Sequence, residues 1–307
     1  MRIYYTDQIR QYDGAITQMG HSVSPYAELI PPNANSYLQY GECTSSCLTQ
    51  VMADNSVPNI KVIAGMLHSH LLGIRMKLRH IYQNGTEAAP ILRDNNYDFN
   101  YQEFRILNQE RVILPGQSLQ VECDYRTTTR SNFTYGGLGT SQEMCIAYTM
   151  YYPKISLSYC ETAPVVDHLL YYLNHTDVRY TSFSAYGSLH DIILNHNNKT
   201  VLQSLNEMHW NQTNANAFSA LMKDIRRSVT CKINGVRHPR VPASEPAISI
   251  TREYVEPIQT CVEPSSGFQV ELMKDVCSVS TRPVPFAAFL FTTFSLVVLT
   301  TLFYHDS

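Results

Sequence analysis

The feature that most constrains the fold of this sequence is a succession of short, β-rich runs separated by turn-forming pairs. Such runs occur at Lys61–Leu67, Gln102–Leu107 and Leu119–Tyr125. Turn signals lie between and beside them, at Asn84-Gly85, Asp94-Asn95, Pro115-Gly116 and Gly136-Gly137. Short strands at close spacing with turn signals between them are typical of antiparallel two-layer β folds. We therefore expect residues 1–161 to form a mainly β domain, an antiparallel jelly roll or β-sandwich.

The sequence changes character after this region. Apolar residues recur at helical spacing in two places, first at Val165, Val166, Leu169, Leu170 and Leu173, and then at Phe218, Leu221, Met222 and Ile225. Asn214 is the expected N-cap of the second helix, and the Asn-rich stretch 195–216 is expected to be a loop. Residues 232–285 show little periodicity. We expect residues 162–281 to form a partly helical, partly irregular C-terminal extension.

The chain ends with an apolar segment, residues 286–303, which reads FAAFLFTTFSLVVLTTLF and carries no charge. Its length is within the range of a membrane-spanning helix. Two interpretations remain open: a transmembrane helix, or a GPI attachment signal with Ser278–Ser280 as the small-residue site. The opening residues Met1–Asp13 contain no apolar core of a signal peptide. This combination suggests that the sequence is a piece of a longer protein.

Eight cysteines and five N-x-S/T sequons indicate the secretory pathway. The sequon asparagines, which are the expected glycosylation sites, are Asn84, Asn132, Asn174, Asn198 and Asn211. A cytosolic zinc site is the alternative for the cysteines, but Cys43 and Cys47 lie four residues apart and no second pair follows. We expect disulfides, and a lumenal or extracellular domain in the endoplasmic reticulum or at the cell-surface membrane. A formal charge of −3 gives no electrostatic basis for binding nucleic acid.

Two short segments could carry chemistry. In Leu67-His68-Ser69-His70 the two histidines are two residues apart, so on a strand both imidazoles point to one face and can reach one metal ion. The alternative is two unrelated histidines, because H-x-H is a short motif. The run 136–139, GGLG, matches no phosphate-binding pattern and is expected to form a tight turn. Met144 taken alone is expected to be a core residue.

Several segments in a fixed order resemble the copper type II, ascorbate-dependent monooxygenases of the dopamine β-hydroxylase-like group, in the half that holds the catalytic copper. The segments are RIYYTDQIRQYDGA (2–15), GECTSSC (41–47), AGMLHSHLLGIRMKLR (64–79), NYQE (100–103) and YGGLGTSQEMCIAYTMYYP (135–153). The resemblance is close over residues 2–160 and continues weakly to about residue 261. The apolar C-terminus points to the membrane-anchored DBH-like branch.

The resemblance implies one copper ion per chain, held by His68, His70 and Met144. It implies hydroxylation of an activated C–H bond with O₂, with ascorbate as the electron donor. Two imidazoles suit Cu(II), whereas a thioether favours Cu(I), so a mixed set of ligands allows copper to cycle between the two states. Tyr148 matches a tyrosine that lines the family's substrate pocket, although a core tyrosine is an equal alternative.

The same resemblance implies the disulfides Cys43–Cys160, Cys47–Cys231 and Cys123–Cys145. Cys261 resembles the cysteine that bridges to the family's other copper domain, and Cys277 has no assignment. That other domain supplies the electron-transfer copper, and this sequence begins after it. We therefore expect the isolated chain to have little or no activity.

Substrate and function leave alternatives open. Relatives that oxidise peptide C-termini carry a basic residue and an amide where this chain has Met66 and Ile146, and neither of these binds a carboxylate. The expected substrate is a small molecule, either aralkylamine-like or another apolar C–H donor. The alternative to an enzyme is a non-catalytic, glycosylated membrane ectodomain with a structural or binding role.

Overall fold

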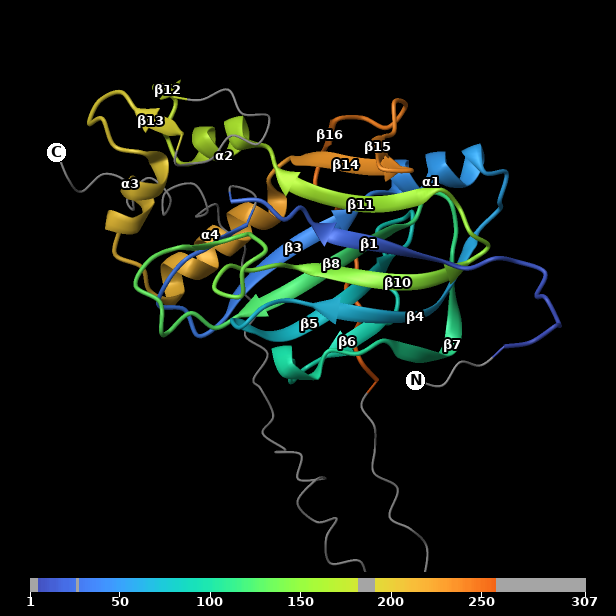
Figure 1. Ribbon diagram of the computed structural model, residues 1–307. Helices are drawn as coiled ribbons and strands as arrows, with labels where there is room; N and C mark the ends of the chain where they lie inside the picture. The colour runs from blue at the N-terminus through green and yellow to red at the C-terminus, as the bar shows by residue number, and fades with distance from the viewer. Residues whose placement is uncertain (1–4, 26–27, 182–190, 258–307) are drawn as a thin grey trace, which may run out of the picture. The chain divides into compact units, whose positions relative to one another are not determined.

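The computed structural model describes residues 5–25, 28–181 and 191–257. The described residues up to Glu256 belong to one compact unit. The described chain is mainly β, and two sheets pack face to face (Figure 1). The larger sheet has eight strands in the order β15-β14-β11-β1-β10-β4-β7, with β16 paired to β14. Its strands are β1 (Ala15–His21), β4 (Ile60–His68), β7 (Arg105–Ile113), β10 (Ile146–Tyr152), β11 (Leu157–Pro164), β14 (Arg227–Ile233), β15 (Val236–Arg237) and β16 (Ser244–Glu245).

The smaller sheet has four strands in the order β3-β8-β5-β6. They are β3 (Tyr37–Cys43), β8 (Ser118–Tyr125), β5 (Gly73–Ile81) and β6 (Leu92–Asp94). Two further pairs of strands lie outside the two sheets: β2 (Leu29–Ile30) with β9 (Thr134–Tyr135), and β12 (Val178–Tyr180) with β13 (Ile192–Leu194). The strand prediction at 119–125 is confirmed by β8, and that at 61–67 by β4. The prediction at 102–107 is wrong at its start, because β7 begins only at Arg105 after a 3₁₀ turn, η1 (Phe99–Tyr101).

One pairing corrects the expectation of a purely antiparallel sheet. Strand β1 pairs antiparallel with β10 but parallel with β11, with Met19 opposite Ala147 on one side and Cys160 on the other. Strands β10 and β11 follow each other along the chain, so they form an opened hairpin with β1 inserted between its arms. The sheet also extends past residue 161, because β14 pairs with β11.

Four α-helices complete the described fold: α1 (Ser45–Asp54), α2 (Val166–Tyr172), α3 (Val201–Glu207) and α4 (Gln212–Asp224). The prediction of helices near 165–173 and 218–225 is confirmed. The expected cap at Asn214 is wrong, because Asn211 is the N-cap and its side chain accepts a hydrogen bond from the Asn214 N–H. The expected loop over 195–216 is wrong in part, because it contains α3, which is capped by Thr200 and Gln203 in a reciprocal capping box.

Three disulfides fasten the fold, at the pairs that the family resemblance implies. Cys43–Cys160 joins β3 to β11 and so links the two sheets, and Cys123–Cys145 joins β8 to the start of β10. Cys47–Cys231 ties α1 to β14. Each bridge closes a loop of 22 to 184 residues, which reduces the entropy of the unfolded chain. Cys261 and Cys277 lie outside the described residues.

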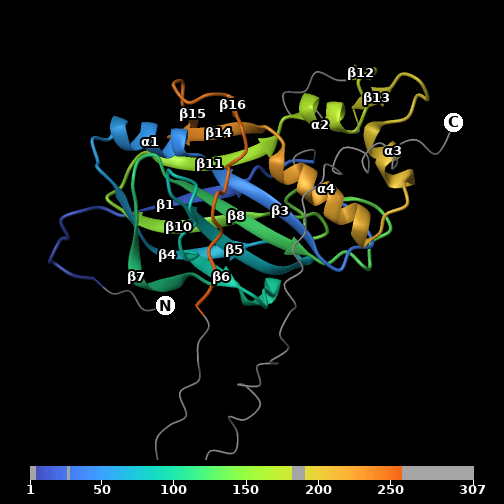
Figure 2. The same cartoon turned by 180° about the vertical axis from the view of Figure 1, so that it is seen from behind.

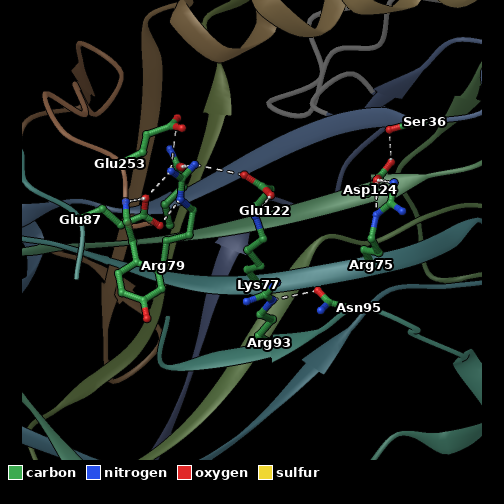
Figure 3. A network of polar contacts seen from close by, with 12 residues as sticks. Ser36, Arg75, Lys77, Arg79, Glu87, Arg93, Asn95, Glu122, Asp124 and Glu253 are labelled. Carbon is green, nitrogen blue, oxygen red and sulfur yellow. Dashed lines mark hydrogen bonds and ion pairs between the residues drawn. The ribbon is translucent and has the colours of Figure 1, made fainter. Parts of the chain in front are cut away.

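The outer face of the smaller sheet carries a ladder of ion pairs (Figure 3). Arg75 pairs with Asp124 at 2.5 Å, and the buried Arg79 pairs with Glu87 at 2.7 Å. The chain after β16 runs back across this face (Figure 2), where the Tyr254 N–H donates to Glu87 at 3.0 Å. Because these charges neutralise one another, the face offers little to a charged ligand.

All five sequon asparagines are exposed. Within residues 5–25, 28–181 and 191–257, no helix is long and apolar enough to cross a membrane. The expected membrane or GPI segment, residues 286–303, lies outside the described part of the chain.

Candidate metal site

Strand β4 brings the two histidines together at its end. His68 is the last residue of β4, and the imidazole rings of His68 and His70 lie edge to face with their centroids 5.3 Å apart. Ile146 of β10 pairs with His68. If the antiparallel register is continued for two residues, Met144 comes opposite His70. The two histidines therefore lie together at one corner of the larger sheet, and the backbone of Met144 lies near them, because Oε2 of Glu143 accepts hydrogen bonds from the His70 N–H at 2.8 Å and from the Met144 N–H at 3.4 Å.

Each imidazole is held through its Nδ1 atom. Nδ1 of His68 hydrogen-bonds Oε1 of Gln102, whose Nε2 in turn donates to the Phe99 carbonyl at 2.7 Å and so fixes the orientation of the amide. Nδ1 of His70 donates to the Gln142 carbonyl at 2.9 Å. Because Oε1 and a carbonyl only accept hydrogen bonds, both Nδ1 atoms carry the proton. In a neutral ring of this tautomer the lone pair is on Nε2, and hydrogen-bonded imidazoles of this kind are the usual form of metal-binding histidines.

Burial supports the same protonation state at His68. Burial lowers the pKa of His68 below its ordinary value, repulsion from His70 lowers it further, and the hydrogen bond with Gln102 opposes both effects. A neutral imidazole at physiological pH is the form that binds a metal.

The buried carboxylate of Glu143, the residue before Met144, is hydrogen-bonded to the turn that contains His70. It accepts hydrogen bonds from Ser69 Oγ at 3.0 Å, from the His70 N–H at 2.8 Å and from the Leu72 N–H at 2.7 Å. Burial raises the pKa of Glu143, while these three donors lower it. One side chain thus connects the two segments that bear the candidate ligands.

The backbone of Met144 has a second support. Tyr125 lies fully buried on β8, and its hydroxyl donates to the Met144 carbonyl at 2.9 Å. The same hydroxyl lies within hydrogen-bond distance of Oε1 of Glu28, at 3.1 Å. Burial, aided by the charge of Glu143, raises the pKa of Glu28 well above its ordinary value, and the hydrogen bond from Tyr125 opposes this shift. The neighbouring Cys123–Cys145 disulfide braces the same segment.

The glycine-rich run is part of this support. A Cβ atom at Gly137 would lie 2.1 Å from Oε1 of Gln142. That oxygen accepts the Gly139 N–H at 3.0 Å, and the Gln142 N–H donates back to the Gly139 carbonyl at 2.9 Å. The run therefore forms a tight turn, as expected, and it positions the Gln142 carbonyl that holds His70.

Tyr148 lies beside the histidines on the same face. It pairs with Met66 two residues before His68, and its ring centroid is 6.4 Å from that of His68. Its side chain is partly exposed and borders a surface cavity of about 380 Å³ together with Ile16 and Tyr159. Burial first, then the charge of Glu161, raises the pKa of Tyr148, so the phenol stays protonated at neutral pH.

The sequence did not reveal which residues hold the two histidines. Gln102, Gln142 and Glu143 lie inside segments that carry the family resemblance, but nothing in their type or spacing gave them a role. Tyr97, whose hydroxyl bonds both the N–H and the carbonyl of Ser69, was missed altogether. Within the described residues no three His, Cys, Asp or Glu side chains cluster as a metal site, so the candidate set depends on the methionine.

Comparison with known proteins identifies the family. The family model described as copper type II ascorbate-dependent monooxygenase, C-terminal domain, matches residues 12–172. DBH-like monooxygenase protein 1 of Gallus gallus is 32% identical over 231 residues, which cover 75% of this chain and 37% of that protein. MOXD1 homolog 1 of Drosophila melanogaster is 40% identical over 185 residues, or 58% of this chain and 26% of the relative.

Dopamine beta-hydroxylase of Rattus norvegicus is 30% identical over 262 residues, or 85% of this chain and 40% of that protein. The matched segments span well under half the length of these relatives. The family model covers more than half of this chain, and its range includes every residue of the His68–His70–Met144 corner. The chain therefore belongs to the copper type II ascorbate-dependent monooxygenase family.

Proposed function

We propose that His68, His70 and Met144 hold one catalytic copper ion, and that the chain is the catalytic part of a monooxygenase that hydroxylates an activated C–H bond with O₂ and ascorbate. The observation that carries this proposal is the pair of Nδ1 tethers, to Gln102 and Gln142, which leaves both Nε2 atoms free for a metal. Such tethers hold the rings in place and make them better ligands.

The donor set fits copper. Two imidazoles and one thioether match the preferences of Cu(II) and Cu(I) respectively, whereas Mg²⁺ or Ca²⁺ would require oxygen ligands. When bound, copper supplies one-electron redox chemistry and activation of O₂. The roles of the chain are to hold the ligands through Glu143 and Tyr125 and to present a substrate surface beside them.

The substrate surface is apolar. Tyr148 and Met66 lie beside His68 on its face of the sheet, both are partly exposed, and neither carries a charge; the adjacent Ile146 is buried. A small molecule with an apolar C–H donor, such as an aralkylamine-like compound, suits this surface better than a peptide carboxylate. Tyr148 would contact the substrate through its ring and its protonated hydroxyl. With its three disulfides and five exposed sequons, the protein would work in the secretory pathway, in the endoplasmic reticulum or at the cell-surface membrane.

Copper titration of the purified chain tests the proposal. We expect one copper ion per chain with submicromolar or tighter Cu(I) affinity, and loss of that ion in the His68→Ala/His70→Ala double variant. A matched control is His168→Ala/His209→Ala, which removes two exposed histidines of the extension. Copper bound equally by both double variants, or by neither of them, would exclude the proposed site.

A second candidate is a glycosylated ectodomain without catalytic activity, favoured by the exposure of all five sequon asparagines. The same titration separates the two: a chain that is glycosylated and folded but takes up no copper would be this second kind of protein.

A further inference from the structure

The backbone of Ser69, which lies between the two candidate histidine ligands, is held by the hydroxyl of Tyr97. This hydroxyl donates to the Ser69 carbonyl at 2.5 Å and accepts the Ser69 N–H at 2.9 Å. Ser69 is fully buried and Tyr97 is only 8% exposed, so both bonds are shielded from water. Burial raises the pKa of Tyr97 to about 12, and the hydroxyl therefore keeps the proton that it donates at neutral pH.

These two bonds replace a strand neighbour at the place where β4 ends. Strand β7 pairs with β4 only as far as Arg105 opposite Gly65, and β4 itself ends at His68. In an extended residue that faces a neighbouring strand, the N–H and the C=O point to the same side. None of the described strands pairs with Ser69, and the single hydroxyl of Tyr97 serves as donor and acceptor in place of a strand.

The Tyr97 hydroxyl is one of three contacts that the same short segment makes with the H-x-H motif. Gln102 hydrogen-bonds Nδ1 of His68. The ring of Phe99 lies edge to face with that of His70, with the two centroids 5.9 Å apart. These two contacts each fix one ring, whereas the Tyr97 hydroxyl fixes the backbone from which both rings project.

Tyr97 is itself anchored to the smaller sheet. Its N–H donates to the carbonyl of Ile74 on β5 at 3.0 Å. The neighbouring Gly73 leaves room for the contact, because a Cβ atom there would lie 3.2 Å from Cδ1 of Tyr97 and 2.6 Å from Oγ of Ser69. The hydroxyl therefore reaches Ser69 from a fixed backbone, and groups supported in this way preorganise a site.

We propose that Tyr97 is a positioning residue of the candidate metal site. Its hydroxyl fixes the Ser69 backbone and, through it, the distance and angle at which the imidazoles of His68 and His70 meet a metal ion. That this ion is copper rests on the proposed function. The pair of histidines is then ordered before the metal binds, so little conformational entropy is lost on binding. Phenylalanine at position 97 would keep the ring but leave both Ser69 groups without a partner.

Copper titration of the full chain and of Tyr97→Phe tests this inference. We expect the affinity for Cu(II) to fall at least about tenfold in the variant, the usual effect of losing a group that orients a metal-binding histidine. Pulsed electron paramagnetic resonance of the Cu(II)-loaded variant should show altered coupling to the nitrogens of both imidazoles. Tyr101→Phe, at a 77% exposed tyrosine of the same segment, is expected to behave like the parent chain.

A second control separates positioning from a general loss of stability. Tyr151 is fully buried on β10, and its hydroxyl donates to the Ile155 carbonyl at 3.1 Å. Tyr151→Phe thus also removes a buried hydroxyl bonded to the backbone, and it should lower the melting temperature without changing copper affinity or the spectrum. If Tyr97→Phe matched Tyr151→Phe in both copper measurements, Tyr97 would have only a structural role and the inference would be overturned.

Two nuclear magnetic resonance measurements on the copper-free chain do not depend on metal binding. In the parent chain the Ser69 N–H should exchange with solvent as slowly as the amides inside β4. Fast exchange there would overturn the inference even if Tyr97→Phe does not fold. In nitrogen-15 spectra, the imidazole signals of His68 and His70 should move in Tyr97→Phe and stay in place in Tyr101→Phe.

These measurements distinguish failure of the inference from failure of the proposed function. If the imidazole signals move in Tyr97→Phe while the parent chain binds no copper, the positioning role stands and the proposed function fails. If copper binds equally tightly to the parent chain and to Tyr97→Phe, with the same spectrum, the proposed function stands and the inference fails.

Discussion

Oε2 of Glu143 accepts a hydrogen bond from the backbone N–H of His70 at 2.8 Å. Because Glu143 directly precedes Met144 in the sequence, this bond links the chain segments of two candidate copper ligands. The carboxylate also accepts hydrogen bonds from Ser69 Oγ and from the Leu72 N–H. The position of His70 relative to Met144 is therefore set by a side chain that itself binds no metal.

Glu143→Gln is expected to weaken both folding and copper binding. The amide NH₂ would replace an acceptor and face N–H or O–H donors, which leaves a buried donor unsatisfied at a cost of about 1–3 kcal/mol. Urea unfolding would measure the loss of stability, and competition with a Cu(I) chelator would measure the affinity. Glu103→Gln, at a highly exposed carboxylate in a neighbouring loop, is the control. If Glu143→Gln had the same stability to urea and the same Cu(I) affinity as this control, Glu143 would not hold the His70 segment in place.

Gln102→Leu is expected to reduce copper affinity by about 10- to 100-fold, the usual effect of losing a hydrogen-bond partner of a metal-binding histidine. Without the Oε1 acceptor, the His68 ring can rotate or carry its proton on Nε2. Gln109→Leu, at an exposed position of β7, is the matched control. Cu(II) titration followed by electron paramagnetic resonance would measure both affinity and ligand geometry, and an unchanged spectrum in Gln102→Leu would refute the role of the tether.

Met144→Leu is expected to lower the affinity for Cu(I) more than the affinity for Cu(II). Leucine has nearly the same volume but no sulfur, so folding should change by less than about 1.5 kcal/mol, whereas the soft ligand that favours Cu(I) is lost. X-ray absorption of the Cu(I)-loaded chain should lose its sulfur scatterer. Met150→Leu, on β10 but away from the histidines, should keep it. Sulfur scattering that persists in Met144→Leu would mean that another group supplies the ligand.

Local signals predicted some of the strands and helices and missed others. The strands at 61–67 and 119–125 were predicted from their β-rich composition and the turn signals around them, and β4 and β8 match them closely. Helix α1 was missed although its signal is present: Leu48, Val51 and Met52 are buried at helical spacing and Thr44 caps the first turn. The polar residues of α1, together with Cys43 before it and Cys47 inside it, concealed the pattern.

Contacts between distant segments could not be predicted. The parallel pairing of β1 with β11 joins residues about 140 positions apart, and no local pattern encodes it. The H-x-H motif is local and was found, but its tethers come from 34 residues away at Gln102 and 73 at Glu143. The residue types of a site are visible in a sequence, whereas the groups that orient them depend on the fold.

The buried carboxyl of Glu161 predicts a pH dependence of stability. Glu161 faces outward on β11 but is only 7% exposed, and burial raises its pKa from 4.5 to about 7, against the opposing effects of Gln18 and Lys232. Its pKa in the folded chain is higher than in the unfolded chain, so the folded state binds more protons between pH 4.5 and about 7. Stability from this group is therefore complete below pH 4.5 and is lost as the pH rises through 7.

Glu161→Gln should remove this dependence, because the amide stays neutral at every pH. We expect the variant and the parent chain to be similarly stable at pH 4, and the variant to be more stable by up to about 3 kcal/mol at pH 8, from 1.36 kcal/mol per pKa unit. Melting temperatures measured from pH 4 to 8.5 would show the two curves separating between pH 4.5 and 7. Glu103→Gln, at an exposed carboxylate, should instead run parallel to the parent. If the melting-temperature curve of Glu161→Gln also stayed parallel to that of the parent chain, the Glu161 carboxyl would have an ordinary pKa. Water would then reach this carboxyl beside Gln18 in the folded chain.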